Sequence, residues 1–209
     1  MTAIYLVRHG TTDWVDTRLL HGITDIPLNE RGKQQAEAAA NALRGIKFNR
    51  LYTSPLSRCV QTAEYVSRVV GIEPIKLDGL KELDFGWLEG RQGRDYRSGK
   101  YGKVTEKSDR FARRIIRAIT GEPLKQFQKR ILAAWQQVLD ENPGGNVAVV
   151  GHSGVFNYLL IHFFGKNFPP GERYYYLNPA SISQLDTSSD EKVVLTSFNN
   201  IAHLSADLL

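Results

Sequence analysis

The chain has 209 residues, of which 42% are hydrophobic, and a formal net charge of +5. This length suits one domain with a sizeable apolar core. The sequence holds no run of 18 apolar residues, which argues against a membrane-spanning helix, and Cys59 is the only cysteine, which excludes an internal disulfide. We expect a cytoplasmic protein, because one cysteine suits a reducing compartment and the chain starts without a signal-peptide pattern.

Apolar runs and helical periodicity alternate along most of the chain. In chain order the predicted elements are a strand over Ala3–Val7, a helix over Asn29–Leu43, a strand over Arg50–Thr53, a helix over Pro55–Val70, a strand over Glu73–Leu77, a helix over Leu124–Leu139, a strand over Asn146–Val150, a helix over Gly154–Phe164, and strands over Ser181–Leu185 and Val193–Phe198. Strands that alternate with helices predict a mostly parallel sheet covered by helices, the α/β class.

The segment from about residue 88 to 122 interrupts this alternation and includes one short amphipathic pattern near Phe111–Ile119. Residues 91–117 contain ten basic and three acidic side chains, whereas the rest of the chain contains 17 basic and 19 acidic ones. A solvated helix and loop would explain this charge, and so would a positive lid that steers anions toward a site. We predict a single domain over 1–209 with a basic lid inserted at about 88–122.

The first predicted strand ends abruptly in Arg8, His9 and Gly10. Ligands bind at the C-terminal ends of strands in open α/β sheets. Histidine is the side chain best suited to act near neutral pH, and the arginine fork pairs with phosphate or carboxylate oxygens. The tripeptide therefore suggests an anion beside a histidine, although a strand followed by an ordinary surface loop explains it equally well.

Three further turns repeat this design at the ends of other predicted elements. Arg58 lies on the first turn of a predicted helix, where the helix dipole favours anions. His152 follows the strand over 146–150, and Glu82 lies in a loop among apolar neighbours. A surface arginine or a solvated glutamate would explain each one alone. Two histidines, two arginines and a glutamate at comparable junctions together predict one anion site.

These residues belong to a series of motifs that covers Ile4 to about Asn178. The motifs are Arg8-His9-Gly10-Thr11-Thr12, Gly22-Ile23-Thr24-Asp25-Ile26-Pro27-Leu28, Tyr52-Thr53-Ser54-Pro55-Leu56-Ser57-Arg58, Glu82-Leu83-Asp84-Phe85-Gly86 with Glu89-Gly90, and Gly151-His152-Ser153-Gly154. In this order they resemble the histidine phosphatase superfamily, which includes the cofactor-dependent phosphoglycerate mutases. The resemblance implies a three-layer α/β/α sandwich and a phosphohistidine mechanism that uses no metal and no cofactor.

The resemblance also implies a role for each of five residues. His9 would attack phosphorus through Nε2 while its Nδ1–H donates to a backbone carbonyl. Arg8 and Arg58 would clamp the phosphoryl oxygens and lower the pKa of His9. His152 would donate to a phosphate oxygen. Glu82 would act as general acid and then as general base, which needs a pKa above its ordinary value of about 4.3.

Four further residues are weaker candidates for contacts with phosphate or substrate. They are Thr12, Thr24, the backbone of Ser153 and His21, and a partly exposed loop histidine is an equally good interpretation of His21. Val15 stands where the family commonly has an asparagine that helps to hold the phosphate. We therefore expect one polar contact to be lost or replaced.

The motif around Glu82 favours hydrolysis. The mutases usually read Glu-Arg-x-Tyr-Gly where this chain reads Glu82-Leu83-Asp84-Phe85-Gly86, and Gly121-Glu122-Pro123-Leu124 is similar to a turn of the phosphatase branch. We expect a phosphatase acting on a small phosphorylated metabolite, and the basic lid suggests a substrate with more than one anionic group. Mutase-type phosphoryl transfer and a non-catalytic anion-binding protein are the alternatives.

The expected partner is the small phosphorylated substrate. The chain has no basic motif interleaved with aromatic residues, so we expect no nucleic-acid partner, and we expect no membrane partner either. Tyr174, Tyr175 and Tyr176 are predicted to be exposed. They suggest either a homodimer interface or, as we favour, a pocket edge or a partly buried lead into a strand.

Overall fold

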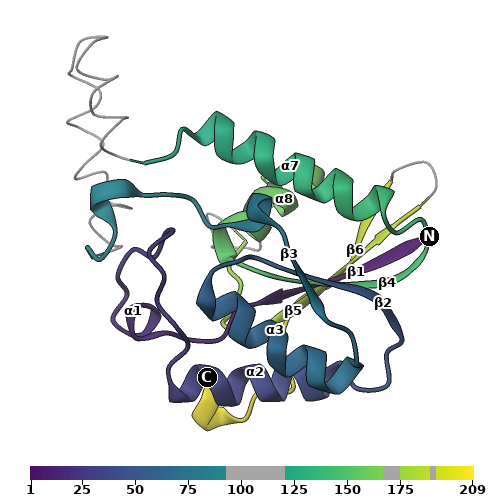
Figure 1. Cartoon of the computed structure of the whole chain (residues 1–209), viewed down its shortest axis with the longest axis horizontal. Helices are drawn as coiled ribbons and strands as arrows, with labels where there is room; N and C mark the ends of the chain where they lie inside the picture. The colour runs from purple at the N-terminus through teal and green to yellow at the C-terminus, as the bar shows by residue number, and fades with distance from the viewer. Residues whose placement is uncertain (93–120, 167–174, 189–191) are drawn as a thin grey trace.

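A computed structural model describes residues 1–92, 121–166, 175–188 and 192–209. One sheet of six strands lies between two helical layers (Figure 1). The strands are β1 (Thr2–Arg8), β2 (Phe48–Thr53), β3 (Pro74–Lys76), β4 (Gly145–Gly151), β5 (Ile182–Thr187) and β6 (Val193–Asn200). The helices of the described residues are α1 (Asp13–Asp16), α2 (Glu30–Ala42), α3 (Ser57–Val70), α7 (Leu124–Asp140) and α8 (Ser153–Phe164), with short 3-10 turns η1 (Asp78–Leu80), η2 (Gly86–Leu88) and η3 (Ala206–Leu208).

The strand order is β3-β2-β4-β1-β5-β6. Strands β1 to β4 are parallel to one another, and β5 and β6 extend the sheet in antiparallel fashion. This arrangement confirms the predicted α/β/α class with a mostly parallel sheet. All six predicted strands are present, and so are the four helices predicted outside residues 88–122. The basic lid and its predicted helix near 111–119 lie almost entirely outside the described residues.

The helices differ from the prediction in two places. The helix expected to begin at Pro55 begins at Ser57, because Leu56 is still extended, with φ −70° and ψ 139°. The short helix α1 was not predicted, since its four residues carry too little periodicity to detect. It forms because the Thr12 side chain caps it by accepting from the Val15 N–H at 3.2 Å.

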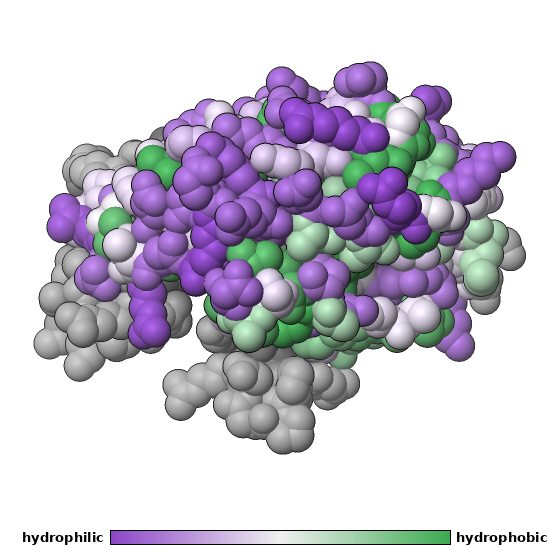
Figure 2. Space-filling model, turned by 90° about the horizontal axis from the view of Figure 1, so that it is seen from below, coloured by the Kyte–Doolittle hydropathy of each residue, from purple (hydrophilic) through white to green (hydrophobic). Residues whose placement is uncertain are grey.

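Each face of the sheet is covered by its own apolar cluster. Helices α7 and α8 pack on one face around Ile131, Phe156 and Leu160, and α2 and α3 pack on the other around Ala39 and Val66. Figure 2 shows the side of the molecule that carries α2 and α3, where hydrophilic side chains cover much of the surface. Both central strands, β1 and β4, are therefore buried on both faces, as their nearly continuous apolar sequences require.

The sheet brings the C-terminal ends of three parallel strands together. β1, β4 and β2 are adjacent and parallel, with Arg8 beside Gly151 and Val150 beside Thr53. Their C-terminal ends therefore meet, and the loops that follow them carry the predicted site residues.

The loop after β1 is held by α2. Asn29 N–H donates to the Thr11 carbonyl at 3.2 Å, and Thr11 N–H donates to the Gln35 side chain at 2.8 Å. A Cβ on Gly32 would lie 2.0 Å from that same Thr11 carbonyl oxygen. The loop that carries the site therefore lies directly on the helix backbone, at a separation that only glycine allows.

We predict that Gly32→Ala destabilises the protein by about 2 kcal/mol or more, although alanine is the better helix former by about 1 kcal/mol. The clash is with backbone, so no side-chain rotation relieves it. Chemical denaturation measures the effect, with Gly144→Ala as the control because the nearest atom to its Cβ would be 3.8 Å away. An unchanged midpoint for Gly32→Ala would show that α2 and the loop do not pack this closely.

Candidate active site

His9 is buried directly after β1 and its backbone is fixed on both sides. Its N–H donates to the Gly151 carbonyl at 3.0 Å, and its own carbonyl accepts from Ala180 at 3.2 Å. The ring Nδ1 lies 2.7 Å from the carbonyl oxygen of Gly10, which can only accept. Nδ1 therefore carries the ring proton and Nε2 carries the lone pair. Within the described residues no hydrogen bond engages Nε2.

Arg58 is fully buried, and three of its N–H groups are bound to protein. Nη1 donates to the carbonyl of Thr24 at 3.0 Å, Nη2 to that of Gly22 at 2.7 Å, and Nε to Nδ1 of His152 at 3.3 Å. A guanidinium has five N–H donors. Within the part of the chain that the structure describes, one N–H on each terminal nitrogen is therefore left for a ligand.

Arg8 is the second buried guanidinium. Its Nη1 donates to the carbonyl of Leu177, whereas its Nε is buried with no hydrogen-bond partner among the described residues. Burial lowers the pKa of Arg8, and the neighbouring Tyr176 and Glu82 oppose that shift. A buried N–H donor without an acceptor is costly, so the site favours an anionic ligand that would satisfy it.

His152 is the residue directly before α8, and both of its ring nitrogens have partners. Because the Arg58 Nε can only donate, Nδ1 of His152 is the acceptor of that bond. The proton is then on Nε2, which lies 2.8 Å from the hydroxyl oxygen of Ser54. The donation to a phosphate oxygen predicted for His152 would therefore require Nε2–H to leave Ser54. As it stands, His152 orients Arg58.

His9 and His152 lie close together, with ring centroids 5.2 Å apart. Burial is the main reason that the pKa of each ring is well below its ordinary value, and the positive charge of Arg58 is the next cause. Both rings are therefore neutral at pH 7. A neutral His9 with a free Nε2 lone pair is in the nucleophilic form.

Glu82 lies in the segment between η1 and η2, and two backbone amides hold its carboxylate. Oε1 accepts from Leu83 at 2.8 Å and Oε2 accepts from Gly154 at 2.9 Å, which joins it to the start of α8. A Cβ on Gly154 would lie 2.3 Å from Oε1, so a side chain at position 154 would displace the carboxylate from this position. Burial raises the pKa of Glu82, while these two hydrogen bonds and the guanidinium groups of Arg58 and Arg8 lower it.

His21 adds a third histidine beside His9, with ring centroids 6.1 Å apart. Its Nδ1 lies 3.3 Å from the hydroxyl oxygen of Thr12, and its ring also packs against Trp14. Its Nε2 is buried without a hydrogen-bond partner among the described residues. Burial, and then Arg58 and Arg8, lower the pKa of His21 to about 3.

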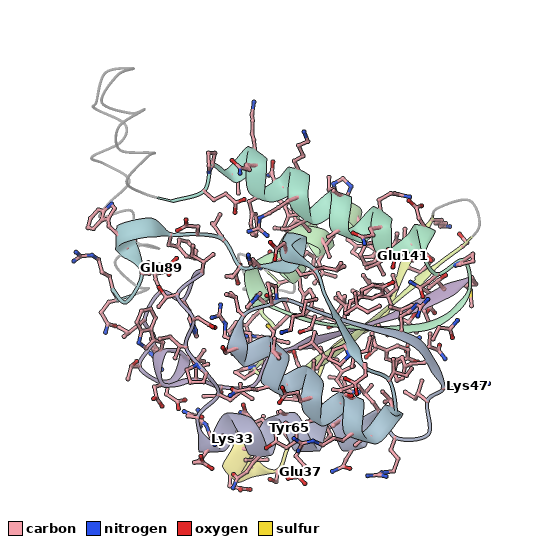
Figure 3. The ribbon with its side chains drawn as sticks, viewed as in Figure 1. Lys33, Glu37, Lys47, Tyr65, Glu89 and Glu141 are labelled. Atoms are coloured by element: carbon pink, nitrogen blue, oxygen red, sulfur yellow. The ribbon has the colours of Figure 1, made fainter. Side chains whose placement is uncertain are left out.

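Glu89 ties together the two loops that form this side of the site. Its carboxylate accepts hydrogen bonds from the backbone of Ile23, Thr24 and Phe85 and from the Thr24 hydroxyl. Figure 3 shows Glu89 where the segment after β3 meets the N-terminal loops. Because the Thr24 and Gly22 carbonyls accept from Arg58, Glu89 indirectly supports that guanidinium. The motif contained Glu89, but no role was predicted for it.

The remaining candidates contribute less. Ser153 is half-buried as the first residue of α8, and Val15 in α1 presents no polar group. Cys59 is buried in α3, with its Sγ 3.4 Å from Nε2 of His152. The prediction of exposed tyrosines was wrong for Tyr175, which is 4% exposed because it packs in the core with α8, whereas Tyr176 is 43% exposed. Tyr174 lies outside the described residues.

Among the described residues no three histidine, cysteine or acidic side chains are grouped so as to hold a metal ion. No helix there is both long and apolar enough to cross a membrane.

The chain was compared with known families and proteins. The family model of the histidine phosphatase superfamily (branch 1) matches residues 4–200. The chain is 29% identical over 205 residues to an uncharacterized phosphatase, PhoE, of Bacillus subtilis, a match that covers 98% of both chains. It is also 29% identical over 220 residues to a probable phosphoglycerate mutase, GpmB, of Cronobacter sakazakii, covering 100% of this chain and 98% of the relative.

A solved structure has the same fold. A mutant phosphoserine phosphatase of Entamoeba histolytica in complex with phosphoserine superposes with a TM-score of 0.74. It is 25% identical, and the match covers 98% of this chain and 100% of that one.

The low pKa of His21 predicts a pH-dependent stability. The folded state keeps this ring neutral down to about pH 3, whereas the unfolded state binds a proton near pH 6.5. Stability from this group is therefore present above pH 6.5 and is lost as the pH falls toward 3, by about 1 kcal/mol per pH unit.

Urea denaturation of the wild type and of His21→Gln at pH 7, 6 and 5 measures this effect. We expect the wild type to lose stability relative to the variant as the pH falls. Parallel pH profiles for the two proteins would contradict a buried, neutral His21.

Proposed function

The chain belongs to the histidine phosphatase superfamily, and from this premise we propose that it hydrolyses phosphate monoesters through a phosphohistidine on His9. One observation carries the proposal. His9 is neutral, its Nδ1–H is bound to the Gly10 carbonyl, and no group of the described residues engages its Nε2 lone pair, which lies beside the guanidinium groups of Arg8 and Arg58.

The charges support a phosphate ligand. Arg8 and Arg58 are both buried, and Glu82 is the buried carboxylate beside them. Among the described residues the Nε of Arg8 and two N–H groups of Arg58 have no acceptor, and a phosphoryl group would satisfy these donors. Such pre-oriented donors also stabilise the charge that spreads over the phosphoryl oxygens in the transition state.

In the first step, Nε2 of His9 attacks phosphorus and the bond from phosphorus to the leaving oxygen breaks. Protonated Glu82 gives its proton to that oxygen, so the product leaves as a neutral alcohol. The raised pKa of Glu82 supports this acid role, and the negative charge of a bound phosphate would raise it further.

In the second step, water attacks the phosphorus of the phosphohistidine. Glu82, now a carboxylate, takes a proton from that water, the bond from phosphorus to nitrogen breaks and inorganic phosphate leaves. Glu82 ends protonated and His9 ends neutral, so the site is restored. No step uses a metal ion or an added cofactor, because Arg8 and Arg58 balance the charge.

The four weaker candidates, which are His21, Thr12, Thr24 and Ser153, are proposed to have different roles. His21 is favoured, since its buried Nε2 lacks a partner in the described residues and the ring stands beside His9. Thr12 orients His21, and Thr24 orients Arg58 through its carbonyl while its hydroxyl donates to Glu89. Ser153 would act through its backbone at the start of α8. His152 would reach the phosphate by exchanging its bond with Ser54.

The substrate is proposed to be a small phosphorylated metabolite with a second anionic group. The excess of basic side chains in residues 91–117 supports this, because that segment follows directly after Glu89 and Gly90 beside the site. A relative of the same fold is described in complex with phosphoserine, which carries a carboxylate besides its phosphate.

Phosphoglycerate mutase activity is the second candidate, since one relative carries the name of a probable mutase. In a mutase the phosphohistidine would transfer its phosphoryl group to a second hydroxyl instead of to water. The motif that begins at Glu82 favours hydrolysis.

We predict that the protein releases phosphate from phenyl phosphate and from 3-phosphoglycerate in the presence of EDTA. His9→Ala should lower kcat by at least about 10³-fold, because the nucleophile is lost. His162→Ala, which removes an exposed histidine of α8, is the matched control and should keep full activity.

Colorimetric phosphate release and NMR analysis of the products measure the outcome. Isomerised phosphoglycerate without free phosphate would establish the mutase instead. Activity that needs added metal, or an unchanged rate in His9→Ala, would overturn the phosphohistidine mechanism.

The basic segment predicts a selective effect on KM. Replacing Arg110, Arg113, Arg114 and Arg117 by glutamine should raise KM about tenfold for a sugar bisphosphate at low salt and leave KM for phenyl phosphate unchanged. The control replaces four exposed basic residues elsewhere by glutamine: Arg44, Lys47, Lys76 and Lys129. Equal KM changes for both substrates, or a change in the control as well, would contradict a role of this segment in recognising polyanions.

A further inference from the structure

We propose that Arg130 is a positioning residue that holds the general acid Glu82 against the leaving group. This inference rests on the function proposed above. Arg130 lies on α7, outside all the sequence motifs, and its guanidinium faces the segment that carries Glu82.

The guanidinium binds three backbone carbonyls of that segment. Nη1 donates to the carbonyls of Gly79 at 2.9 Å and Lys81 at 2.6 Å, and Nη2 donates to that of Glu82 itself at 2.9 Å. Glycine at position 79 allows the segment to approach the backbone of α7 this closely, because a Cβ there would lie 2.8 Å from the carbonyl oxygen of Arg130. The backbone of the general acid is therefore bound directly to α7.

Glu122 fixes the orientation of this guanidinium. Its carboxylate accepts from Nε of Arg130 at 2.8 Å and from Nη2 at 2.7 Å, a bidentate pair. The pair is largely shielded, with side-chain exposures of 22% for Arg130 and 11% for Glu122. The Glu122 N–H also donates to the Asp84 carbonyl at 3.0 Å, and Arg130 stacks on Phe127. The two residues thus hold the chain on both sides of Glu82.

These contacts complement those of the carboxylate. The amides of Leu83 and Gly154 fix the side-chain oxygens of Glu82, but neither fixes the Glu82 backbone relative to the sheet. Arg130 supplies that restraint. A shift of about 1 Å in a catalytic group can cost about 10²-fold in rate. Loss of the hydrogen bonds from Arg130, which we call the clamp, should therefore weaken proton transfer although Glu82 itself remains.

General acid catalysis matters most for a poor leaving group. Phenyl phosphate releases a phenol whose ordinary pKa is about 10 and which needs the proton. 4-Nitrophenyl phosphate releases a much more acidic phenol that leaves readily without it. The ratio of kcat/KM for the two esters therefore reports proton donation, whereas a general structural defect would lower both values alike.

The experiment measures this ratio for the wild type, Arg130→Gln, Arg130→Lys, Glu122→Gln and Glu82→Gln, with Lys129→Gln as the exposed control on the same helix. We expect Arg130→Gln to lose about 10²-fold in kcat/KM for phenyl phosphate but only a few-fold for the nitrophenyl ester, following the same pattern as Glu82→Gln. Arg130→Lys keeps the charge without the fork and should fall between.

A pH profile gives a second readout. Loosening the segment admits water to Glu82, so the alkaline limb of kcat/KM for phenyl phosphate should move to lower pH in Arg130→Gln and Glu122→Gln. If Arg130→Gln fails to fold, Glu122→Gln keeps the guanidinium and still tests the clamp.

Other outcomes would overturn the positioning role of Arg130. Equal losses for both esters with an unmoved pH limb, or full activity of Arg130→Gln, would overturn the positioning role while leaving the hydrolase intact. A leaving-group effect in Lys129→Gln would overturn it too. A wild type inactive toward both esters would overturn the proposed function and this inference together.

Discussion

The burial of two guanidinium groups is the constraint on which the rest of the site depends. Arg8 and Arg58 are removed from water beside the neutral rings of His9 and His152, with Glu82 as the buried carboxylate among them. Burying a cation without compensation is unfavourable by several kcal/mol. Backbone carbonyls supply part of the compensation, and a phosphoryl anion would supply the remainder. The same positive charge helps to keep the His9 ring neutral, so in the proposed mechanism the charge that binds the phosphoryl group also keeps His9 nucleophilic.

The loops around the site satisfy this constraint. Arg58 needs acceptors, and the turn from Gly22 to Thr24 presents two carbonyls to it. Because these carbonyls point toward Arg58, the amides of Ile23 and Thr24 point away from it and donate to Glu89. Glu82 shows the reverse arrangement, because amides hold its carboxylate and Arg130 holds its carbonyl. Hydrogen bonds between charged side chains and backbone groups therefore hold these loops in place.

The fold and the five central residues were predictable because their signals are local. An apolar strand that ends in Arg8-His9-Gly10, and turns that present Arg58 and His152, can be recognised within a few residues. The partners that hold those residues were not predictable. Arg130 is separated from Glu82 by 48 positions and Ser54 from His152 by 98, and an arginine on an amphipathic helix ordinarily indicates a solvated face. Only tertiary packing places such groups, so the residues that support the site could not be found from the sequence.

In the proposed mechanism Glu82 is an acid in one step and a base in the next, and its surroundings shift its pKa in both directions. Burial raises its pKa, while two amide hydrogen bonds and two guanidinium groups lower it. A bound phosphate would add negative charge beside the carboxylate and neutralise the guanidinium groups, which favours the proton at the moment it is needed. Once the leaving oxygen has taken that proton, water is the group that can return it. One carboxylate can then serve both steps with no proton source besides the attacking water, provided that its backbone stays in place through both.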